Sequence, residues 1–123
     1  MPVSSRPYQG RAPFVCPVIP ERERVRIAPA GDLDLATSPE LRSTIDELLG
    51  SGFDDVVVDL ANVTFLDSSG LQVLLAAHEA AELGGYRFRL RAGPPAVQRI
   101  FELTGTLDRL DFESFGRRFA GQR

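Results

Sequence analysis

Residues 59–71 read DLANVTFLDSSGL, and this stretch decides how the rest of the chain is interpreted. Its apolar part is typical of a buried strand, and a short turn leads from that strand into a helix. Asp67, Ser68 and Ser69 place one acid and two hydroxyls at the N-terminus of the predicted helix, here called the helix mouth. Helix N-termini expose unpaired N–H groups and a partial positive charge. The helix mouth could therefore accommodate a phosphate on Ser68 or Ser69.

Strands and helices alternate on both sides of this stretch. Periodicity predicts strands over residues 14–19, 24–28, 56–60 and 86–90, and helices that open at 38–39, 69 and 94–95 and end at glycines 50, 84 and 105. Ser38 is the expected N-cap of the first helix, and residues 31–34 (GDLD) are expected to form a turn that leaves the second strand. Residues 14–19 are expected at the sheet edge because two prolines flank their end. This pattern predicts an α/β fold with a small, mixed, mostly parallel β-sheet and helices packed on it.

The chain of 123 residues has the length of one domain. Residues 1–13 are rich in proline, serine and glycine and predict a flexible tail. The domain is expected to span residues 14–116, followed by a short basic tail over 117–123. Near its end, residues 107–112 predict a short strand or a turn, and Phe115 and Phe119 could anchor a final helical segment.

Composition excludes several classes of function. The chain has no lysine, which excludes a P-loop and Schiff-base chemistry. One histidine and one cysteine cannot form a His/Cys zinc site, so no metal or cofactor is expected. With a net charge of −3 and no basic stripe, nucleic-acid binding is not expected. No apolar run is long enough to span a membrane and no secretory signal is present, so a cytoplasmic protein is expected.

The sequence also argues against an enzyme. A nucleophilic Ser68 or Ser69 would need a base, and His78 is the only histidine. His78 lies about two to three turns further along the same predicted helix, too far to reach either hydroxyl. The nucleophile-elbow pattern Gly-x-Ser-x-Gly is absent. No catalytic residue is therefore assigned.

A purely structural role is the alternative interpretation of the helix mouth, with Asp67 or Ser68 as the cap and Gly70 permitting close packing. Two features favour a functional role. A helix needs one cap, yet three polar side chains cluster here. Phe65 and Leu66 before the site and Leu71 after it give an apolar surround with a polar centre, which is typical of a docking surface.

The chain resembles the STAS-domain proteins of the anti-sigma factor antagonist family over roughly residues 24–113. The matching segments are 31–34 (GDLD), 57–60 (VVDL), 63–71 (VTFLDSSGL), 84–85 (GG), 96–97 (AV) and 101–105 (FELTG). The central DSSGL, preceded by a strand that ends in Asp-Leu, is fairly specific, and Phe-x-x-Thr-Gly near residue 105 is a second marker. The resemblance implies a single STAS domain.

The resemblance also implies a bacterial partner-switching role. The unphosphorylated antagonist would bind an anti-sigma factor, itself a serine kinase, and so release a sigma factor. In this family the phosphorylated residue directly follows the Asp of the motif, which implies Ser68, with Ser69 as the second choice. A serine phosphatase would reset the cycle, and the protein would be a monomer or weak dimer. The implied partner-binding residues are Asp34, Asp67, Ser68, Ser69, Gly70 and Leu71.

A STAS adaptor that is never phosphorylated is the second interpretation. Such a domain docks onto a transporter or a larger signalling complex, and its helix-mouth serine serves only as a cap. The intact acid–hydroxyl–hydroxyl–glycine sequence at residues 67–70 favours the phosphorylated switch.

Overall fold

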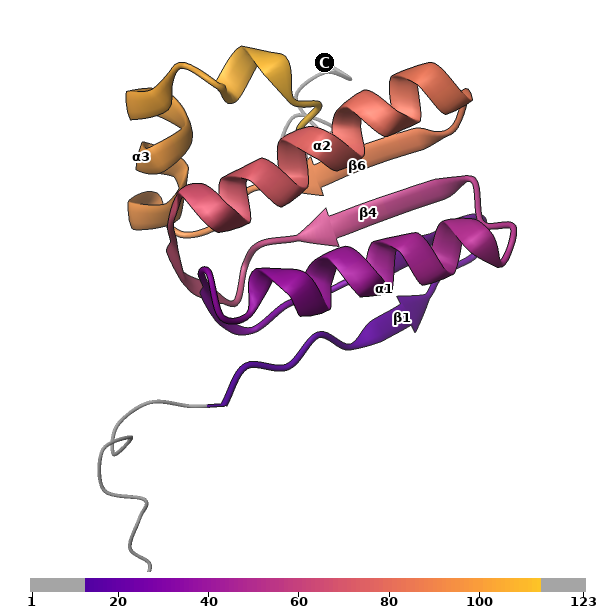
Figure 1. Ribbon diagram of the computed structural model, residues 1–123, viewed down its shortest axis with the longest axis horizontal. Helices are drawn as coiled ribbons and strands as arrows, with labels where there is room; N and C mark the ends of the chain where they lie inside the picture. The colour runs from indigo at the N-terminus through magenta and orange to yellow at the C-terminus, as the bar shows by residue number, and fades with distance from the viewer. Residues whose placement is uncertain (1–12, 114–123) are drawn as a thin grey trace, which may run out of the picture.

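The computed structural model describes residues 13–113, in which helices pack on a β-sheet (Figure 1). The elements are β1 (Val18–Pro20), β2 (Val25–Ile27), β3 (Gly31–Leu33), α1 (Ser38–Gly50), β4 (Asp55–Asp59), β5 (Val63–Leu66), α2 (Ser68–Gly84), β6 (Arg87–Arg91), α3 (Pro95–Thr104) and a 3-10 helix (Leu107–Arg109). The predicted α/β class is confirmed. Residues 1–12 and 114–123 lie outside the described residues. They include Phe115, Phe119, all but one residue of the expected N-terminal tail and the whole expected C-terminal tail.

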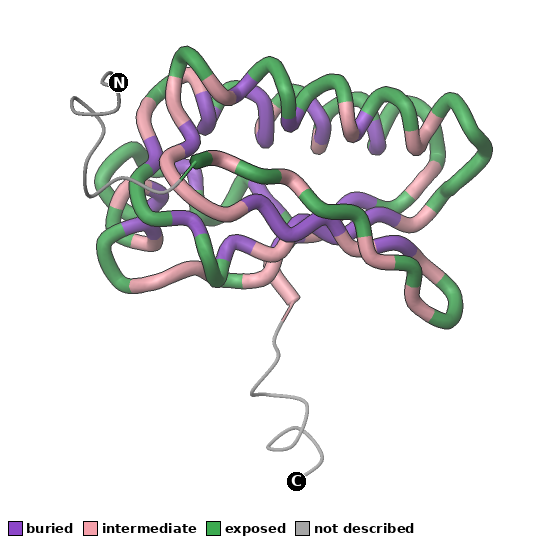
Figure 2. Tube along the Cα trace, turned by 90° about the horizontal axis from the view of Figure 1, so that it is seen from below, coloured by how far each residue is buried: buried purple, intermediate pink, exposed green. Residues whose placement is uncertain are grey.

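The main sheet has the strand order β1-β2-β4-β6. β2, β4 and β6 run parallel, and β1 pairs antiparallel with β2 at one edge, the position expected for residues 14–19. The strand is shorter than expected, since β1 covers only Val18–Pro20 and Val15 makes an isolated bridge to Ala30. Figure 2 shows the helical layer above the strands, and α1 and α2 lie side by side across them in Figure 1. α3 lies at the end of the molecule, where it contacts β5. The mostly parallel sheet is therefore confirmed.

The core lies between the main sheet and its helices. Val25, Val56 and Phe88 are neighbours in register across β2, β4 and β6, and so are Ile27, Val58 and Leu90. These two rows pack with Leu41 and Ile45 of α1 and with Leu71 and Leu74 of α2, as the helical periodicity predicts. The helix-facing side of the sheet is thus closed by apolar contacts.

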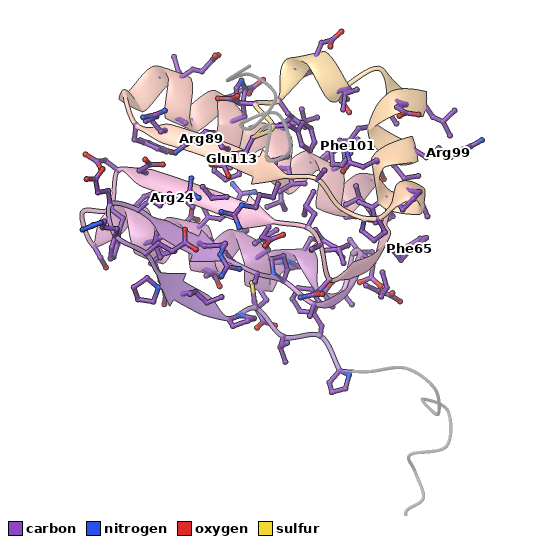
Figure 3. All side chains as sticks on the ribbon, turned by 180° about the vertical axis from the view of Figure 1, so that it is seen from behind. Arg24, Phe65, Arg89, Arg99, Phe101 and Glu113 are labelled. Carbon is purple, nitrogen blue, oxygen red and sulfur yellow. The ribbon has the colours of Figure 1, made fainter. Side chains whose placement is uncertain are left out.

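Ion pairs cover the opposite face of the sheet. Val57 is fully buried, although strand alternation turns it away from the helices. Four arginines and four carboxylates surround it and pair with one another: Arg24, Arg26, Arg89, Arg91, Glu21, Asp55, Asp59 and Glu113. Several of these side chains can be seen in front of the sheet in Figure 3. The middle of β4 is therefore buried on both faces, by the apolar core on one side and by this charge-balanced network on the other.

Glu113 is the centre of this network, because its carboxylate contacts Arg24, Arg89 and Arg91. Its side chain is only 15% exposed. Burial alone would raise the pKa of Glu113, but the hydrogen bonds from Arg24 and Arg91 outweigh it and hold the pKa below its ordinary value. The residue also ties the end of the described chain to β6, since its N–H donates to the Leu90 carbonyl at 2.7 Å.

Glu113→Gln is therefore expected to destabilise the protein by about 1–3 kcal/mol at neutral pH, since three arginines lose their shared anion. A carboxyl whose folded-state pKa is lowered stabilises the fold above its ordinary pKa, and this stabilisation is lost as pH falls through the lowered value. The difference between wild type and variant in urea unfolding should shrink below about pH 4.5. Glu102→Gln, at an exposed position of α3, is the control, and an equal effect there would contradict the assignment.

Two local expectations were wrong. Residues 31–33 are a strand rather than a turn, because β3 pairs parallel with β5 in a second, two-stranded sheet. The N-cap position of α1 is Thr37, and Ser38 is the first helical residue, 5% exposed. The Asp34 side chain instead accepts hydrogen bonds from the backbone of the preceding turn, at Ala36 and Thr37.

Residues 107–112 were expected to form a short strand or a turn, and the structure contains an element of each kind. Residues Leu107–Arg109 form a 3-10 helix, and Phe112 then makes an isolated parallel bridge to Leu90. The Phe112 ring meets the ring of buried Phe101 edge-on, with 5.2 Å between their centroids. α3 ends at Gly105, which adopts the left-handed conformation with φ 72°.

Candidate functional site

Asp67 caps helix α2 at its mouth. Its backbone is extended, and its Oδ1 accepts hydrogen bonds from the N–H groups of Ser69 at 2.8 Å and Gly70 at 3.2 Å. The Leu71 N–H donates to the Asp67 carbonyl at 3.0 Å and begins the helical bond pattern. An aspartate satisfies two of the unpaired N–H groups here and places a negative charge at the positive end of the helix. The structural requirement for a cap is therefore met by Asp67.

The two serines differ in exposure. Ser68 is the first residue of α2 and is exposed, whereas Ser69 is half-buried. Neither hydroxyl is needed for the cap, since both capping bonds go to the Asp67 carboxylate. The Ser68 side chain therefore stands at the mouth of α2, where a helix stabilises an added anion.

Gly70 and Leu71 lie inside the protein rather than on the docking surface expected from the sequence. Both are buried, and so is Leu66, at 2% exposed. A Cβ on Gly70 would come within 2.8 Å of the Leu33 carbonyl oxygen, so a glycine lets α2 approach β3 closely. Of the apolar residues expected around the site, only Phe65 is exposed, at 51%.

The β3–β5 pair brings the loop with Asp34 to the helix mouth. Leu33 and Leu66 are partners in register, and the Asp67 N–H donates to the Leu33 carbonyl at 3.2 Å. Asp34 and Asp67 each follow one of these paired residues, so both carboxylates lie at the same end of the small sheet. The structure thus brings together the implied site residues Asp34, Asp67, Ser68 and Ser69, although the two acids are 33 positions apart in the sequence.

The loop after β3 is held by its own hydrogen bonds. The Thr37 hydroxyl donates to the Asp32 carbonyl at 2.7 Å and accepts from the Asp34 N–H at 2.9 Å. Asp34 Oδ1 accepts from the N–H groups of Ala36 and Thr37, at 3.0 and 3.1 Å. Asp34 therefore fixes the shape of the loop as well as adding charge beside the helix mouth.

Sequence reasoning missed two neighbours of the site. Leu35 is 75% exposed in the loop after β3, where it follows Asp34 and precedes Ala36 in the sequence. Thr64 of β5 is exposed, and its hydroxyl donates to Asp32 Oδ1 at 2.7 Å across the small sheet. A large apolar residue in a short loop next to an aspartate was the available signal for Leu35, but the pairing of β3 with β5 was needed to place it.

His78 lies away from the helix mouth. It is nine residues after Ser69 on α2, about 14 Å along the helix axis. Its Nε2 lies 3.4 Å from Glu82 Oε2, and it borders a surface cavity of about 330 Å³ together with Leu75 and Arg109. The geometry gives His78 no access to either serine hydroxyl.

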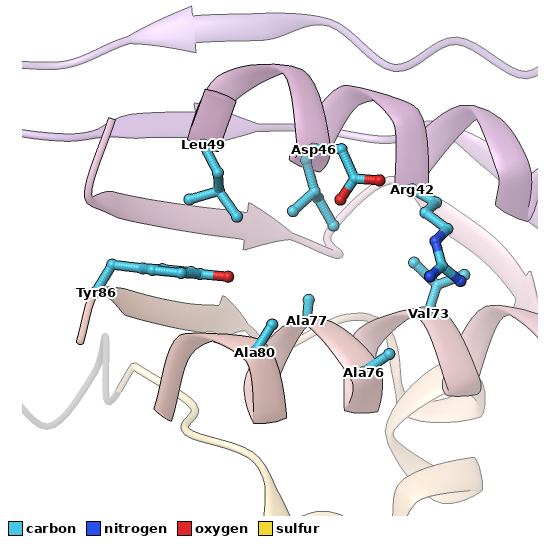
Figure 4. Close-up of a pocket in the computed structure, with 9 residues that line it drawn as sticks. Arg42, Asp46, Leu49, Val73, Ala76, Ala77, Ala80 and Tyr86 are labelled. Atoms are coloured by element: carbon cyan, nitrogen blue, oxygen red, sulfur yellow. The ribbon is translucent and has the colours of Figure 1, made fainter. Parts of the chain in front are cut away.

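A groove between α1 and α2 is a second cavity. Alanines 76, 77 and 80 of α2 form one wall, and Arg42, Asp46 and Tyr86 also line it (Figure 4). Its volume is about 80 Å³, below the roughly 300–1,000 Å³ typical of small-molecule sites. We therefore assign no ligand to this groove.

Residues 13–113 contain no group of three or more His, Cys, Asp or Glu side chains placed to hold a metal ion. None of the helices in this part of the chain combines the length and apolar character needed to cross a membrane.

The comparisons with known proteins agree with the fold. The family model described as "Mlab, STAS domain" matches residues 20–112. An anti-sigma-B factor antagonist of Staphylococcus epidermidis is 32% identical over 78 residues, which cover 63% of this chain and 72% of that protein.

Two solved structures extend the comparison. The crystal structure of an anti-sigma factor antagonist from Mycobacterium paratuberculosis is 28% identical with a TM-score of 0.74, and the match covers 83% of this chain and 86% of that one. The Bacillus cell fate determinant SpoIIAA in its phosphorylated form shares the fold, with a TM-score of 0.62 at 21% identity, over 90% of this chain and 100% of that one.

Proposed function

Because this chain belongs to the anti-sigma factor antagonist family of STAS-domain proteins, we propose that it binds an anti-sigma factor through the helix mouth of α2 and that phosphorylation of Ser68 ends this binding. The observation that supports the proposal best is that the residue that caps the helix and the residue proposed to be phosphorylated are different. Asp67 alone makes the capping bonds, which leaves Ser68 exposed at the first helical position. The comparisons support the antagonist role, since the Staphylococcus and Mycobacterium relatives bear that name.

The partner proposed here is an anti-sigma factor that is also a serine kinase. Unphosphorylated protein would occupy it and so release a sigma factor. The kinase would bind the ATP and transfer its phosphate to Ser68, and a serine phosphatase would later remove it. Both reactions would take place in the cytoplasm. The protein itself would act by binding and not as an enzyme. SpoIIAA, which shares the fold, has a phosphorylated form, and this makes the same chemistry reasonable here.

Electrostatics explains how one phosphate could switch binding. A phosphoserine adds about −1.5 to −2 charges and three strong acceptor oxygens. The N-terminus of α2 stabilises part of that charge, so the fold itself need not change. A partner packed against Ser68 would meet added bulk and an unpaired charge beside Asp67, which disfavours the complex.

Ser69 is the less favoured acceptor. It is half-buried and its N–H donates to Asp67, so it belongs to the hydrogen-bonded cap. A kinase would have to draw Ser69 out of the first turn to reach its hydroxyl, whereas Ser68 is already exposed. We therefore assign the phosphate to Ser68.

A reconstitution experiment tests the antagonist role. Each serine-kinase anti-sigma factor of the source genome would be purified as a complex with its sigma factor, without ATP, and titrated with unphosphorylated protein. We expect the protein to displace the sigma factor from one such complex. Size-exclusion chromatography would detect the released sigma factor. If no complex releases its sigma factor, the antagonist role is contradicted and the adaptor interpretation gains support.

A further inference from the structure

We infer that Thr37 is a positioning residue of the binding site. Its hydroxyl holds the loop after β3 so that the Asp34 carboxylate lies beside the helix mouth, with one oxygen ready to accept a hydrogen bond from the anti-sigma factor. The inference rests on the proposed function, because it takes the helix mouth and Asp34 together as the surface that the anti-sigma factor covers. It adds a residue that affects binding through Asp34.

Thr37 occupies the N-cap position of α1, but its side chain does not cap this helix. A threonine at this position usually accepts a hydrogen bond from the second or third N–H group of the helix. The Thr37 side chain makes no such bond. Its hydroxyl instead donates to the Asp32 carbonyl at 2.7 Å and accepts from the Asp34 N–H at 2.9 Å. Thr37 therefore forgoes a common helix-stabilising bond and makes contacts that fix the preceding loop.

One peptide group joins this loop to the helix mouth. The Leu33 carbonyl accepts a hydrogen bond from the Asp67 N–H at 3.2 Å. The N–H of the same peptide group, which belongs to Asp34, donates to the Thr37 hydroxyl. A peptide group is planar, so these two bonds fix its orientation from both sides. If the Thr37 bond is lost, the group is held from the helix side alone, and the loop with Asp34 can move relative to the mouth.

The loop uses one oxygen of the Asp34 carboxylate and leaves the other for a partner. Oδ1 accepts from the N–H groups of Ala36 and Thr37, at 3.0 and 3.1 Å, and lies 3.2 Å from the Thr37 hydroxyl. Among residues 13–113, no hydrogen bond or ion pair reaches Oδ2. A side chain that is already oriented loses little freedom on binding, which favours affinity. Oδ2 is therefore the atom that a hydrogen-bond donor of the anti-sigma factor would meet.

Hydrogen exchange of the purified protein, followed by NMR, tests the positioning without a partner. Thr37→Val removes the hydroxyl and keeps the side-chain shape, whereas Thr37→Ser keeps the hydroxyl. In Thr37→Val the Asp34 amide should exchange roughly tenfold faster, because it loses its acceptor. The Gly70 amide, which bonds to Asp67, should keep its rate, and Thr37→Ser should restore the rate of Asp34. Thr44→Val is the matched control, since Thr44 is half-buried and its hydroxyl also donates to a backbone carbonyl, at 2.8 Å.

Calorimetric titration with the anti-sigma factor tests the consequence for binding. The titrations are run without ATP and below the melting temperature of each variant, where reduced stability alone leaves the affinity of the folded protein unchanged. Thr37→Val is expected to weaken binding roughly tenfold, and Thr37→Ser and Thr44→Val by less than about threefold.

A double-mutant cycle shows whether Thr37 acts through Asp34. Asp34→Asn keeps one oxygen for the loop and removes the charge of the carboxylate. It is expected to weaken binding roughly tenfold by itself, since the hydrogen bond lost is one to a charged group. In the Asp34→Asn background, Thr37→Val should weaken binding by less than about a further threefold, because the carboxylate that it positions is gone.

Four results would overturn the inference. If the Asp34 amide keeps its exchange rate in Thr37→Val, the hydroxyl does not hold the loop. If Thr37→Val costs a full tenfold in the Asp34→Asn background as well, Thr37 does not act through Asp34. If Thr37→Val binds as tightly as Thr44→Val while Ser68→Asp does not bind, the positioning role is wrong and the proposed function stands. If no anti-sigma factor binds the wild type, the proposed function fails and the inference fails with it.

Discussion

Replacing Ser68 with aspartate is expected to weaken binding to the cognate anti-sigma factor roughly 30-fold or more, with no loss of thermal stability. The fold should tolerate the change because Ser68 is exposed at the first position of α2. A carboxylate there interacts favourably with the helix N-terminus, by about 0.3–1 kcal/mol. In the complex the same carboxylate would be desolvated next to Asp67 without a counter-charge. The effect should therefore appear in binding alone.

Calorimetric titration would measure the affinity for the anti-sigma factor, and thermal unfolding of the same samples would measure their stability. Ser43→Asp is the matched control, since it adds the same charge at an exposed position of α1. Ser43→Asp should bind like the wild type. Equal affinities for Ser68→Asp and the wild type would argue that the helix mouth does not contact the partner.

Gly70→Ala is expected to destabilise the protein by about 3 kcal/mol and to lower its melting temperature by about 10 °C or more. The added Cβ would lie 2.7 Å from Leu66 Cδ1 and 2.8 Å from both the Leu33 Cγ and its carbonyl oxygen. Backbone cannot move aside as a flexible side chain can, so α2 would have to shift away from β3. That shift would strain the Asp67-to-Leu33 hydrogen bond and misplace the helix mouth.

Gly50→Ala is the control for this substitution. Gly50 is the last residue of α1, and a Cβ there meets nothing within 4 Å. Alanine favours helices over glycine by up to about 1 kcal/mol, so this variant should be unchanged or slightly more stable. Differential scanning calorimetry of both variants measures the contrast. A Gly70→Ala variant as stable as the wild type would refute the close approach of α2 to β3.

Much of the fold could be predicted from local sequence patterns. The spacing of Leu41 and Ile45 identifies the buried face of α1, and the β-branched run of β4 indicates a central strand. Gly105 terminates α3 in the left-handed conformation, as its position after Thr104 suggests. These features depend on residues that are close together in the sequence, so the sequence alone is enough to predict them.

The errors concern contacts between distant segments. Residues 31–33 are too short and too polar to be recognised as a strand, and they become one only through pairing with residues 63–66. The same pairing turns Leu66 inward and leaves Phe65 outside, so the apolar surround expected at the site is mostly core. The ion pairs that bury Val57 likewise join residues as far apart as Arg24 and Glu113.

The candidate site was only partly accessible to sequence reasoning. The DSSG motif marks the helix mouth, but whether Asp67 or a serine caps the helix depends on side-chain geometry. The closeness of Asp34 to the mouth follows from the β3–β5 register, which no local pattern contains. Leu35 stayed unnoticed for the same reason.

Intact-mass spectrometry tests the central claim most directly. The wild type, Ser68→Ala and Ser69→Ala would each be incubated with ATP and the anti-sigma factor kinase that binds the wild type. The account predicts one added phosphate on the wild type and on Ser69→Ala, and none on Ser68→Ala. A phosphate that persists on Ser68→Ala, or a wild type that stays unmodified while the kinase phosphorylates a known antagonist, would contradict it.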